Sequence, residues 1–182
     1  TNHDRFFDFE ITDDPDEADH NFHYSGELQD LLSKTYQQVR KKKPHLIPHL
    51  QKLIAKYPKV PAFKNYLMLC YQLAGKLNKA YEINRRVVQE HPDYTFGKIN
   101  LALEHVEKKE FEEALDILGA DLDLKQLVPG RRVFHVSEFR AFLNVVCRYL
   151  IETGQLEAAE QRLEEAGEML GEEDEAMNNW RL

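Results

Sequence analysis

The sequence has few of the features that mark secreted, membrane-spanning or disulfide-bonded proteins. Its 182 residues include only two cysteines, Cys70 and Cys147, and both lie in apolar stretches. Such cysteines are expected to be free core thiols of a reducing compartment. No apolar run of about 18 residues is long enough to span a membrane, and no secretion leader opens the chain. These absences favour a cytoplasmic protein. The chain begins with Thr1 rather than Met, so a trimmed chain or a removed leader stays open.

The sequence also lacks the motifs of common catalytic and nucleotide-binding sites. It contains no GxxxxGKS/T, no GxGxxG, no HExxH and no GxSxG pattern. Neither cysteine has a basic partner nearby in the sequence, and a buried thiol is a poor nucleophile. We therefore expect no enzyme, no catalytic residue and no cofactor.

One acidic stretch is similar to a calcium-binding loop but does not fit one. Asp14 occupies the first position of such a loop. However, Asp19 stands where the turn requires glycine, and Ser25 stands where the bidentate acid belongs. A solvated tail is the better interpretation of this segment.

A histidine pair is the second candidate for metal binding. His45 and His49 are four residues apart and would share one face of a helix, with His20 or His23 as a third ligand. Pro48 lies within the run, no acid is close in the sequence, and the neighbouring lysines repel a cation. We expect surface histidines and no metal.

Charge is distributed unevenly along the chain, whose net charge is −8. Residues 1–27 contain nine acidic residues and a single arginine, whereas residues 34–64 contain nine basic residues and no acid. Residues 152–175 contain ten acidic residues and again one arginine. A charge distribution this polarised can steer partners or pair with itself.

A short pattern recurs along the chain at one constant offset, the separation of Ala80 from Ala114. Ala159 follows Ala114 by a longer step, which equals the same offset plus a short insertion. The other pairs at this offset are Leu67 with Leu101, Tyr71 with His105, Leu77 with Phe111 and Pro58 with Pro92. Matches in a single register indicate an internal repeat.

Each repeat has the pattern of two helices joined by a tight turn. Apolar residues at steps of three and four predict a helix over residues 62–74. Gly75 ends it, because glycine adopts the left-handed cap conformation at little cost. A second helix starts at Leu77 and ends before Pro92, and the small Ala80 allows the two helices to approach closely.

The insertion in the third repeat predicts a loop over residues 119–135. Pro129-Gly130 marks a turn within this loop. Ser137 is the expected N-cap of the helix that follows.

This pattern resembles the tetratricopeptide repeat family. Units of that family contain about 34 residues, with a large–small pair and a later aromatic residue in the first helix, an alanine in the second helix and a terminal proline. The matching residues are Leu67-Met68, Tyr71, Ala80 and Pro92 in one unit, Leu101-Ala102 and Ala114 in the next, and Val146-Cys147, Gly154, Ala159 and Ala166 in a third. The chain departs from the family at Lys64 and Lys98, which replace its tryptophan, and at His105, which replaces an aromatic residue.

The resemblance implies an all-α, right-handed solenoid of stacked antiparallel helix pairs with about 3.5 units. The repeat domain would cover residues 27–182, after an acidic, aromatic-containing tail at residues 1–26. Its expected parts are units at 27–60, 61–94, 95–135 and 136–171, followed by a capping segment at 172–182.

In this family the first helices of the units line a concave groove that binds peptides. The residues that would face the groove here are Tyr66, Leu69, Phe96, Asn100, Leu103, Asn144 and Arg148, with Asn65 beside them. Asparagine is disfavoured inside helices, and its amide can bond a peptide backbone. The competing interpretation is that the tyrosine and the leucines only complete the core.

The favoured function is a non-catalytic adaptor that binds a peptide or helix of another protein. Family members that bind chaperone C-termini clamp the terminal carboxylate with lysines and asparagines. Only Asn100 matches that clamp here, so a chaperone role is not expected.

The basic segment 34–64 supports an alternative function. Arg40, Lys41, Lys42 and Lys43 form a patch that would bind the phosphates of a nucleic acid or an anionic surface. The acidic net charge, and the lack of aromatic residues interleaved with the patch, weigh against a nucleic acid.

The charge pattern also predicts self-recognition. The tail, with Phe6, Phe7 and Phe9, would fold back on the basic segment. Otherwise the basic end of one molecule would meet the acidic residues 152–175 of the next in a weak, salt-sensitive association.

Overall fold

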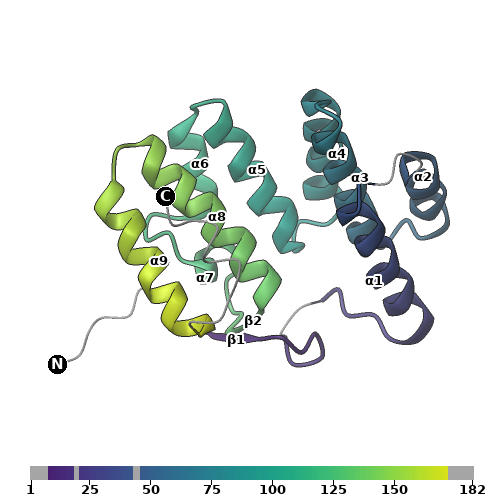
Figure 1. Ribbon diagram of the computed structural model, residues 1–182, viewed down its shortest axis with the longest axis horizontal. Coiled ribbons are helices and arrows are strands. Elements are labelled where there is room, and N and C mark those ends of the chain that lie inside the picture. The colour runs from purple at the N-terminus through teal and green to yellow at the C-terminus, as the bar shows by residue number, and fades with distance from the viewer. Residues whose placement is uncertain (1–7, 19–20, 43–45, 172–182) are drawn as a thin grey trace. The chain divides into compact units, whose positions relative to one another are not determined.

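The computed structural model describes residues 8–18, 21–42 and 46–171 (Figure 1). This part of the chain is mostly helical, with nine α-helices and two short strands. Its contacts divide the chain into an N-terminal unit, Asn21–Leu101, and a C-terminal unit that combines Thr1–His20 with Ala102–Leu182. The unit boundary falls within one helix, α5 (Thr95–Glu107).

The N-terminal unit is built around α3. Its helices are α1 (Gly26–Arg40), α2 (Leu46–Lys56), α3 (Pro61–Leu73), α4 (Leu77–Glu90) and the first part of α5. Helices α1, α2 and α4 all pack against α3. Their shared core contains Leu32, Val39, Leu50, Phe63 and Leu67, whose burial provides the main driving force for packing. Pro61 starts α3, where the missing amide hydrogen is tolerated.

The C-terminal unit is built around a pair of long helices, α8 (Val136–Glu152) and α9 (Leu156–Leu170), which pack against each other. Helix α6 (Phe111–Leu118) packs against α8, and the short α7 (Leu124–Leu127) packs against α6. Buried side chains of α8, among them Phe139, Phe142 and Val146, form much of this core.

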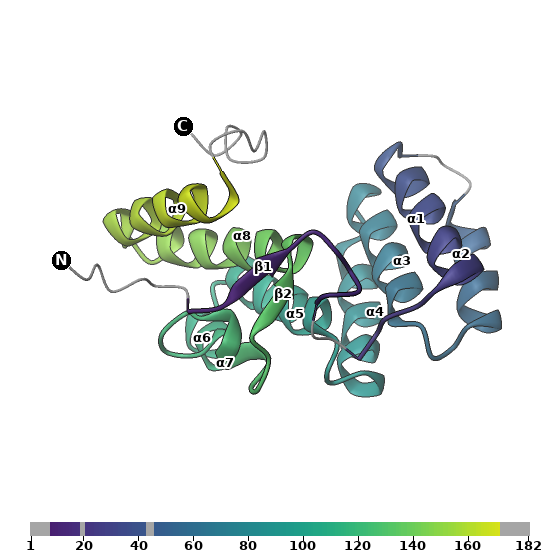
Figure 2. The same ribbon diagram turned by 90° about the horizontal axis from the view of Figure 1, so that it is seen from below.

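A two-stranded parallel sheet completes the C-terminal unit. Strand β1 (Glu10–Thr12) pairs with β2 (Val133–His135), with Ile11 opposite Phe134, and both strands pack against α8 (Figure 2). Phe9 makes edge-on contacts with Phe134 and Phe139, at ring-centroid distances of 5.2 and 5.7 Å. The helical part of the all-α expectation is confirmed, but that expectation misses the sheet. Three-residue strands are too short to produce a periodic signal in the sequence.

The tail was expected to fold back onto the basic segment, and this is wrong for residues 9–12. These residues pack on β2 and α8 instead, because Phe9 fits an apolar surface there and the backbone of β1 pairs with β2. Lys125 Nζ adds a 2.9 Å ion pair with Asp8 Oδ2. Phe6 and Phe7 lie outside the described residues.

The insertion is more ordered than the loop expected over residues 119–135. It contains α7 and β2, and the turn predicted at Pro129-Gly130 is confirmed. The predicted N-cap is wrong, because α8 begins after His135 rather than after Ser137. The ring nitrogen Nδ1 of His135 accepts from the Ser137 backbone amide at 3.2 Å, and Glu138 Oε2 accepts from the His135 amide at 3.0 Å. This reciprocal capping places the helix start two residues earlier.

The repeat in the sequence is also a repeat in backbone geometry. Three helices end in the same tight turn, centred on Gly75, Lys109 and Gly154. In the first turn, Gly75 N–H donates to Gln72 O at 2.9 Å and Lys76 N–H donates to Tyr71 O at 2.8 Å, which is the Schellman pattern. The same pair of bonds recurs at the other two turns. The alanine that follows each turn, Ala80, Ala114 or Ala159, is buried as its small size predicts.

Candidate functional site

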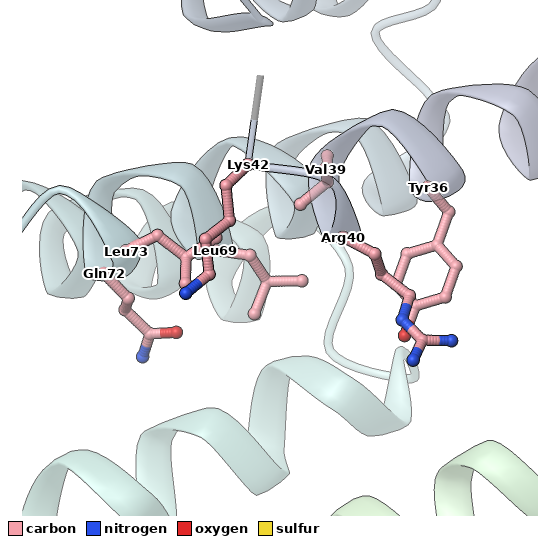
Figure 3. A pocket seen from close by; sticks show the side chains of 7 residues that line it. All are labelled: Tyr36, Val39, Arg40, Lys42, Leu69, Gln72 and Leu73. Carbon is pink, nitrogen blue, oxygen red and sulfur yellow. The ribbon is translucent and has the colours of Figure 1, made fainter. Parts of the chain in front are cut away.

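The N-terminal unit contains a pocket between the last turns of α1 and α3 (Figure 3). Its volume is about 410 Å³. The lining residues are Tyr36, Val39 and Arg40 from the end of α1 and Lys42 just after it, with Leu69, Gln72 and Leu73 from α3. Each helix contributes residues at positions i, i+3 and i+4, which place their side chains on one face of the helix.

The floor of the pocket is apolar. Val39 is buried and Leu69 is partly buried, whereas Leu73 is 54% exposed. Exposed leucines are common singly, but this one lies at the edge of a cavity lined by two more apolar side chains. The pocket therefore offers apolar surface that no described residue of the N-terminal unit covers.

Two tyrosines extend this surface along α1 and α3. Tyr36 lines the pocket, and its ring centroid lies 5.5 Å from that of Tyr66. Tyr66 in turn meets the buried Phe63 edge-on at 6.3 Å. Burial, with a smaller contribution from Tyr36, raises the pKa of Tyr66 to about 12. Its hydroxyl therefore stays neutral and acts as a hydrogen-bonding group at physiological pH.

The polar part of the pocket is basic. Arg40 and Lys42 are both exposed, and Figure 3 shows their side chains on the same side of α1 as Leu69 and Tyr36. Lys42 has a φ of +52°, a left-handed conformation that ends α1. None of the seven lining residues is acidic.

The basic surface is smaller than the sequence indicated. Lys64 is buried and forms an ion pair with Glu90, so its charge is not available to a ligand. Lys56 lies over the ring of Tyr57, 5.1 Å from its centroid. Arg40, Lys41 and Lys42 of the predicted patch are exposed, and Lys43 lies outside the described residues.

Of the residues predicted to line a groove, four belong to the N-terminal unit. Leu69 lines the pocket, and Tyr66 is connected to it through Tyr36. Asn100 donates from its side-chain amide to Asn65 Oδ1 at 2.9 Å. Phe96 is partly buried and lies 5.6 Å from the ring of Tyr94.

The other three predicted groove residues belong to the C-terminal unit. Arg148 donates to Glu107 Oε1 at 3.2 Å, and Leu103 is partly buried. Asn144 is also partly buried, and its Oδ1 has no hydrogen-bond partner in the part of the chain that the structure describes. The seven predicted residues are thus divided between two units, and Leu69 is the one that lines the pocket.

Neither cysteine has the properties of a nucleophile. Burial raises the pKa of the Cys147 thiol to about 11, against a smaller opposing effect of Arg162. Burial also raises the pKa of Cys70, which is partly buried. Both thiols are free, and both are protonated at neutral pH.

The structure provides no support for a metal site among the residues it describes. No group of three or more histidine, cysteine or acidic side chains is placed to hold a metal ion there. His49 and His23 are exposed, and His20 and His45 lie outside the described residues. No helix in the same described ranges is long and apolar enough to cross a membrane.

Sequence reasoning missed two buried arginines of the C-terminal unit. Arg131 forms a two-fold ion pair with Glu138, with both N–O distances at 2.9 Å, and its guanidinium lies 4.4 Å from the centroid of Phe134. Arg162 donates to the carbonyl oxygens of Leu122 and Asp121, at 3.1 and 2.7 Å. The contacts of Arg162 connect segments that are distant in the sequence, so no local pattern predicts them.

The pocket residues Tyr36, Val39, Gln72 and Leu73 were also missed as a site. Their i, i+3 and i+4 spacing beside two basic residues was visible in the sequence. It did not stand out, because the same spacing marks any helix face that is buried in a core.

Comparison of the chain with models of protein families, with curated proteins and with solved structures gives no match.

Proposed function

We propose that the chain is a non-catalytic interaction module that binds a peptide or helix of another protein in the pocket between α1 and α3. The observation that carries the proposal is the position of Leu73, which is 54% exposed at the edge of an apolar cavity of about 410 Å³. A pocket with apolar walls and a few convergent polar groups is the usual form of a binding site.

We also propose that the helices form a right-handed solenoid of about 3.5 units similar to tetratricopeptide repeats. Support comes from the Schellman turn that recurs at Gly75, Lys109 and Gly154, and from the buried alanine after each turn. In that family the first helix of each unit contacts the ligand. Helices α1 and α3 would be the first helices of their units, and they are the two that line the pocket.

Placing the site in this pocket narrows the groove predicted from the sequence. Leu69 lines the pocket and Tyr66 extends it through Tyr36, whereas Asn100 is paired with Asn65 and Arg148 with Glu107. We therefore assign the binding role to Leu69 and to the surface around it. The cytoplasmic location and the weak head-to-tail association stay predictions from the sequence.

The pocket favours a peptide over a nucleic acid. Single-stranded nucleic acids bind through stacked bases and a track of phosphate contacts. Here Arg40 and Lys42 flank aliphatic side chains, and the one aromatic residue in the lining, Tyr36, already packs on Tyr66. An aliphatic floor with a charged edge suits the alternating chemistry of a peptide.

Selection from a displayed library of random peptides tests this function. Peptides recovered on the wild-type chain should lose most of their affinity for Leu73→Ser. They should bind Leu77→Ser normally, because Leu77 is similarly exposed, at 46%, but does not line the pocket. Failure to recover any peptide, or recovery of peptides that bind all three proteins equally, would show that this pocket is not a peptide site.

A further inference from the structure

We infer that the ligand of this pocket is an acidic peptide segment that carries one large apolar side chain. The inference rests on the proposed peptide-binding function and specifies the chemical class of its ligand. It follows from three properties of the pocket: the sign of its charge, its apolar lining and the polar groups beside that lining.

The charge around the pocket is of one sign. Arg40 and Lys42 line it, and the exposed Lys41 lies between them in the chain. No aspartate or glutamate occurs from Lys34 to Tyr81, a stretch that includes the end of α1 and all of α2 and α3. With no acid in this stretch to neutralise them, the two basic side chains attract a ligand of negative charge.

The pocket has room for a large apolar side chain of a ligand. The volume of the whole pocket, about 410 Å³, lies near the lower end of the range for ligand pockets, roughly 300–1,000 Å³. Val39, Leu69 and Leu73 form the aliphatic part of its lining, so a leucine, methionine or phenylalanine of the ligand would displace water from aliphatic surface. Because the basic groups flank this space, acidic residues are expected on either side of the buried side chain.

Two further groups suit a peptide backbone. The amide of Gln72 both donates and accepts, and it lies one residue before the exposed Leu73. The Tyr36 hydroxyl at the α1 side is a second donor and acceptor. A peptide seated on Leu69 would thus meet hydrogen-bonding side chains from both helices, in addition to the two cations.

Fluorescence anisotropy with synthetic peptides tests the ligand class. The probe is a short labelled peptide with one leucine between glutamates. Its first comparison peptide carries glutamine for each glutamate, and its second carries alanine for the leucine. Each exposed ion pair contributes up to about fivefold in affinity, so the glutamate probe should bind about tenfold more tightly than the glutamine peptide. The difference should shrink between about 0.1 M and about 1 M salt, as the Debye length falls from ~10 Å to ~3 Å.

Variants of the chain localise the effect. Arg40→Gln and Lys42→Gln should each weaken binding of the glutamate probe several-fold and leave binding of the glutamine peptide nearly unchanged. Lys41→Gln is the matched control, since Lys41 is exposed and adjacent but does not line the pocket. Loss of binding by the alanine peptide would support a buried apolar side chain.

The possible results distinguish the ligand class from the function itself. Equal binding of the glutamate and glutamine peptides, both weakened by Leu73→Ser, would overturn the acidic preference and leave peptide binding intact. The acidic preference would also be overturned, with peptide binding intact, if the glutamate probe did not bind while library-selected peptides bound and were weakened by Leu73→Ser. An equal effect of all three basic substitutions, or tighter binding of a single-stranded oligonucleotide than of the probe, would identify the site as a general anion surface and contradict the inference.

Discussion

Lys109 adopts the same left-handed backbone conformation that Gly75 adopts at the equivalent position of the preceding repeat, with φ values of +61° and +70°. Both residues follow a first helix, and both donate to the carbonyl three residues before them, at 3.0 and 2.9 Å. Glycine adopts this conformation freely, whereas a side chain at Cβ crowds the backbone. The repeat therefore imposes the turn on Lys109 against its own preference.

Exchanging these two residue types should change stability in opposite directions. Lys109→Gly should raise the free energy of unfolding by about 0.5–1 kcal/mol, and Gly75→Lys should lower it by about 1–2 kcal/mol. Urea unfolding measures both changes. Lys52→Gly, in the interior of α2, is the control and should lower stability by about 1 kcal/mol. A loss of stability in Lys109→Gly would contradict the shared turn.

The small residue after the turn gives a second prediction. Ala80 is fully buried in α4, which packs against α3. Ala80→Leu should therefore lower the free energy of unfolding by about 1–3 kcal/mol through overpacking. Ala55→Leu, on the exposed side of α2, should change it little. Equal melting temperatures of the wild type and Ala80→Leu would show that the register of the repeat is wrong.

The offset of the repeat was sufficient to predict helix positions but not the sheet or the pocket. The helix expected over 62–74 with its stop at Gly75 corresponds to α3, and the helix from Leu77 corresponds to α4. These features follow from local periodicity and from glycine geometry. The pairing of β1 with β2 joins segments that are far apart in the chain, and so depends on tertiary contacts that no local pattern encodes.

In the candidate site, too, the sequence indicated single residues but not how they are arranged. Arg40 and Lys42 stood out in the sequence as charges, and Leu69 as a groove residue, but nothing in the sequence joined them. The asparagines at 65 and 100 were expected to face a ligand, and the sequence did not indicate the hydrogen bond that joins them to each other. The sequence shows that a polar group sits on a helix face but not which partner satisfies it.

Phe9 should anchor the N-terminal strand. Its ring contacts Phe134 and Phe139, so Phe9→Ala should lower the stability of the C-terminal unit by about 1–3 kcal/mol. Glu10→Ala removes the exposed side chain of the next residue, the first of β1, and is the control. Hydrogen exchange at β2 should accelerate in Phe9→Ala alone. Unchanged exchange there would contradict the anchoring role of Phe9.

His91 should make the N-terminal unit sensitive to mild acid. Burial lowers its pKa from 6.5 and the charge of Lys64 lowers it further, while Glu90 and the Pro58 backbone oppose the shift. The unfolded chain therefore binds more protons between pH 6.5 and the folded-state pKa, so stability falls as the pH decreases through that window. The contribution of His91 is complete above pH 6.5.

Substitution of this histidine tests the pH dependence. The free energy of unfolding of the wild type should be lower at about pH 5 than at about pH 7.5, and His91→Gln should reduce this difference. His49→Gln, on the exposed face of α2, controls for the loss of a histidine. If the free energy of unfolding changed with pH by the same amount in the wild type and in His91→Gln, His91 would not be the cause of the pH dependence.

Methyl NMR of the leucines during titration with a library-selected peptide tests the central claim most directly. The account predicts that the methyl signals of Leu69 and Leu73 shift together and saturate, because both line the pocket between α1 and α3. Leu77 and Leu156, which are exposed outside the pocket, should keep their positions. Saturating shifts at Leu77 or Leu156, with Leu69 and Leu73 unmoved, would contradict the assignment of the binding site.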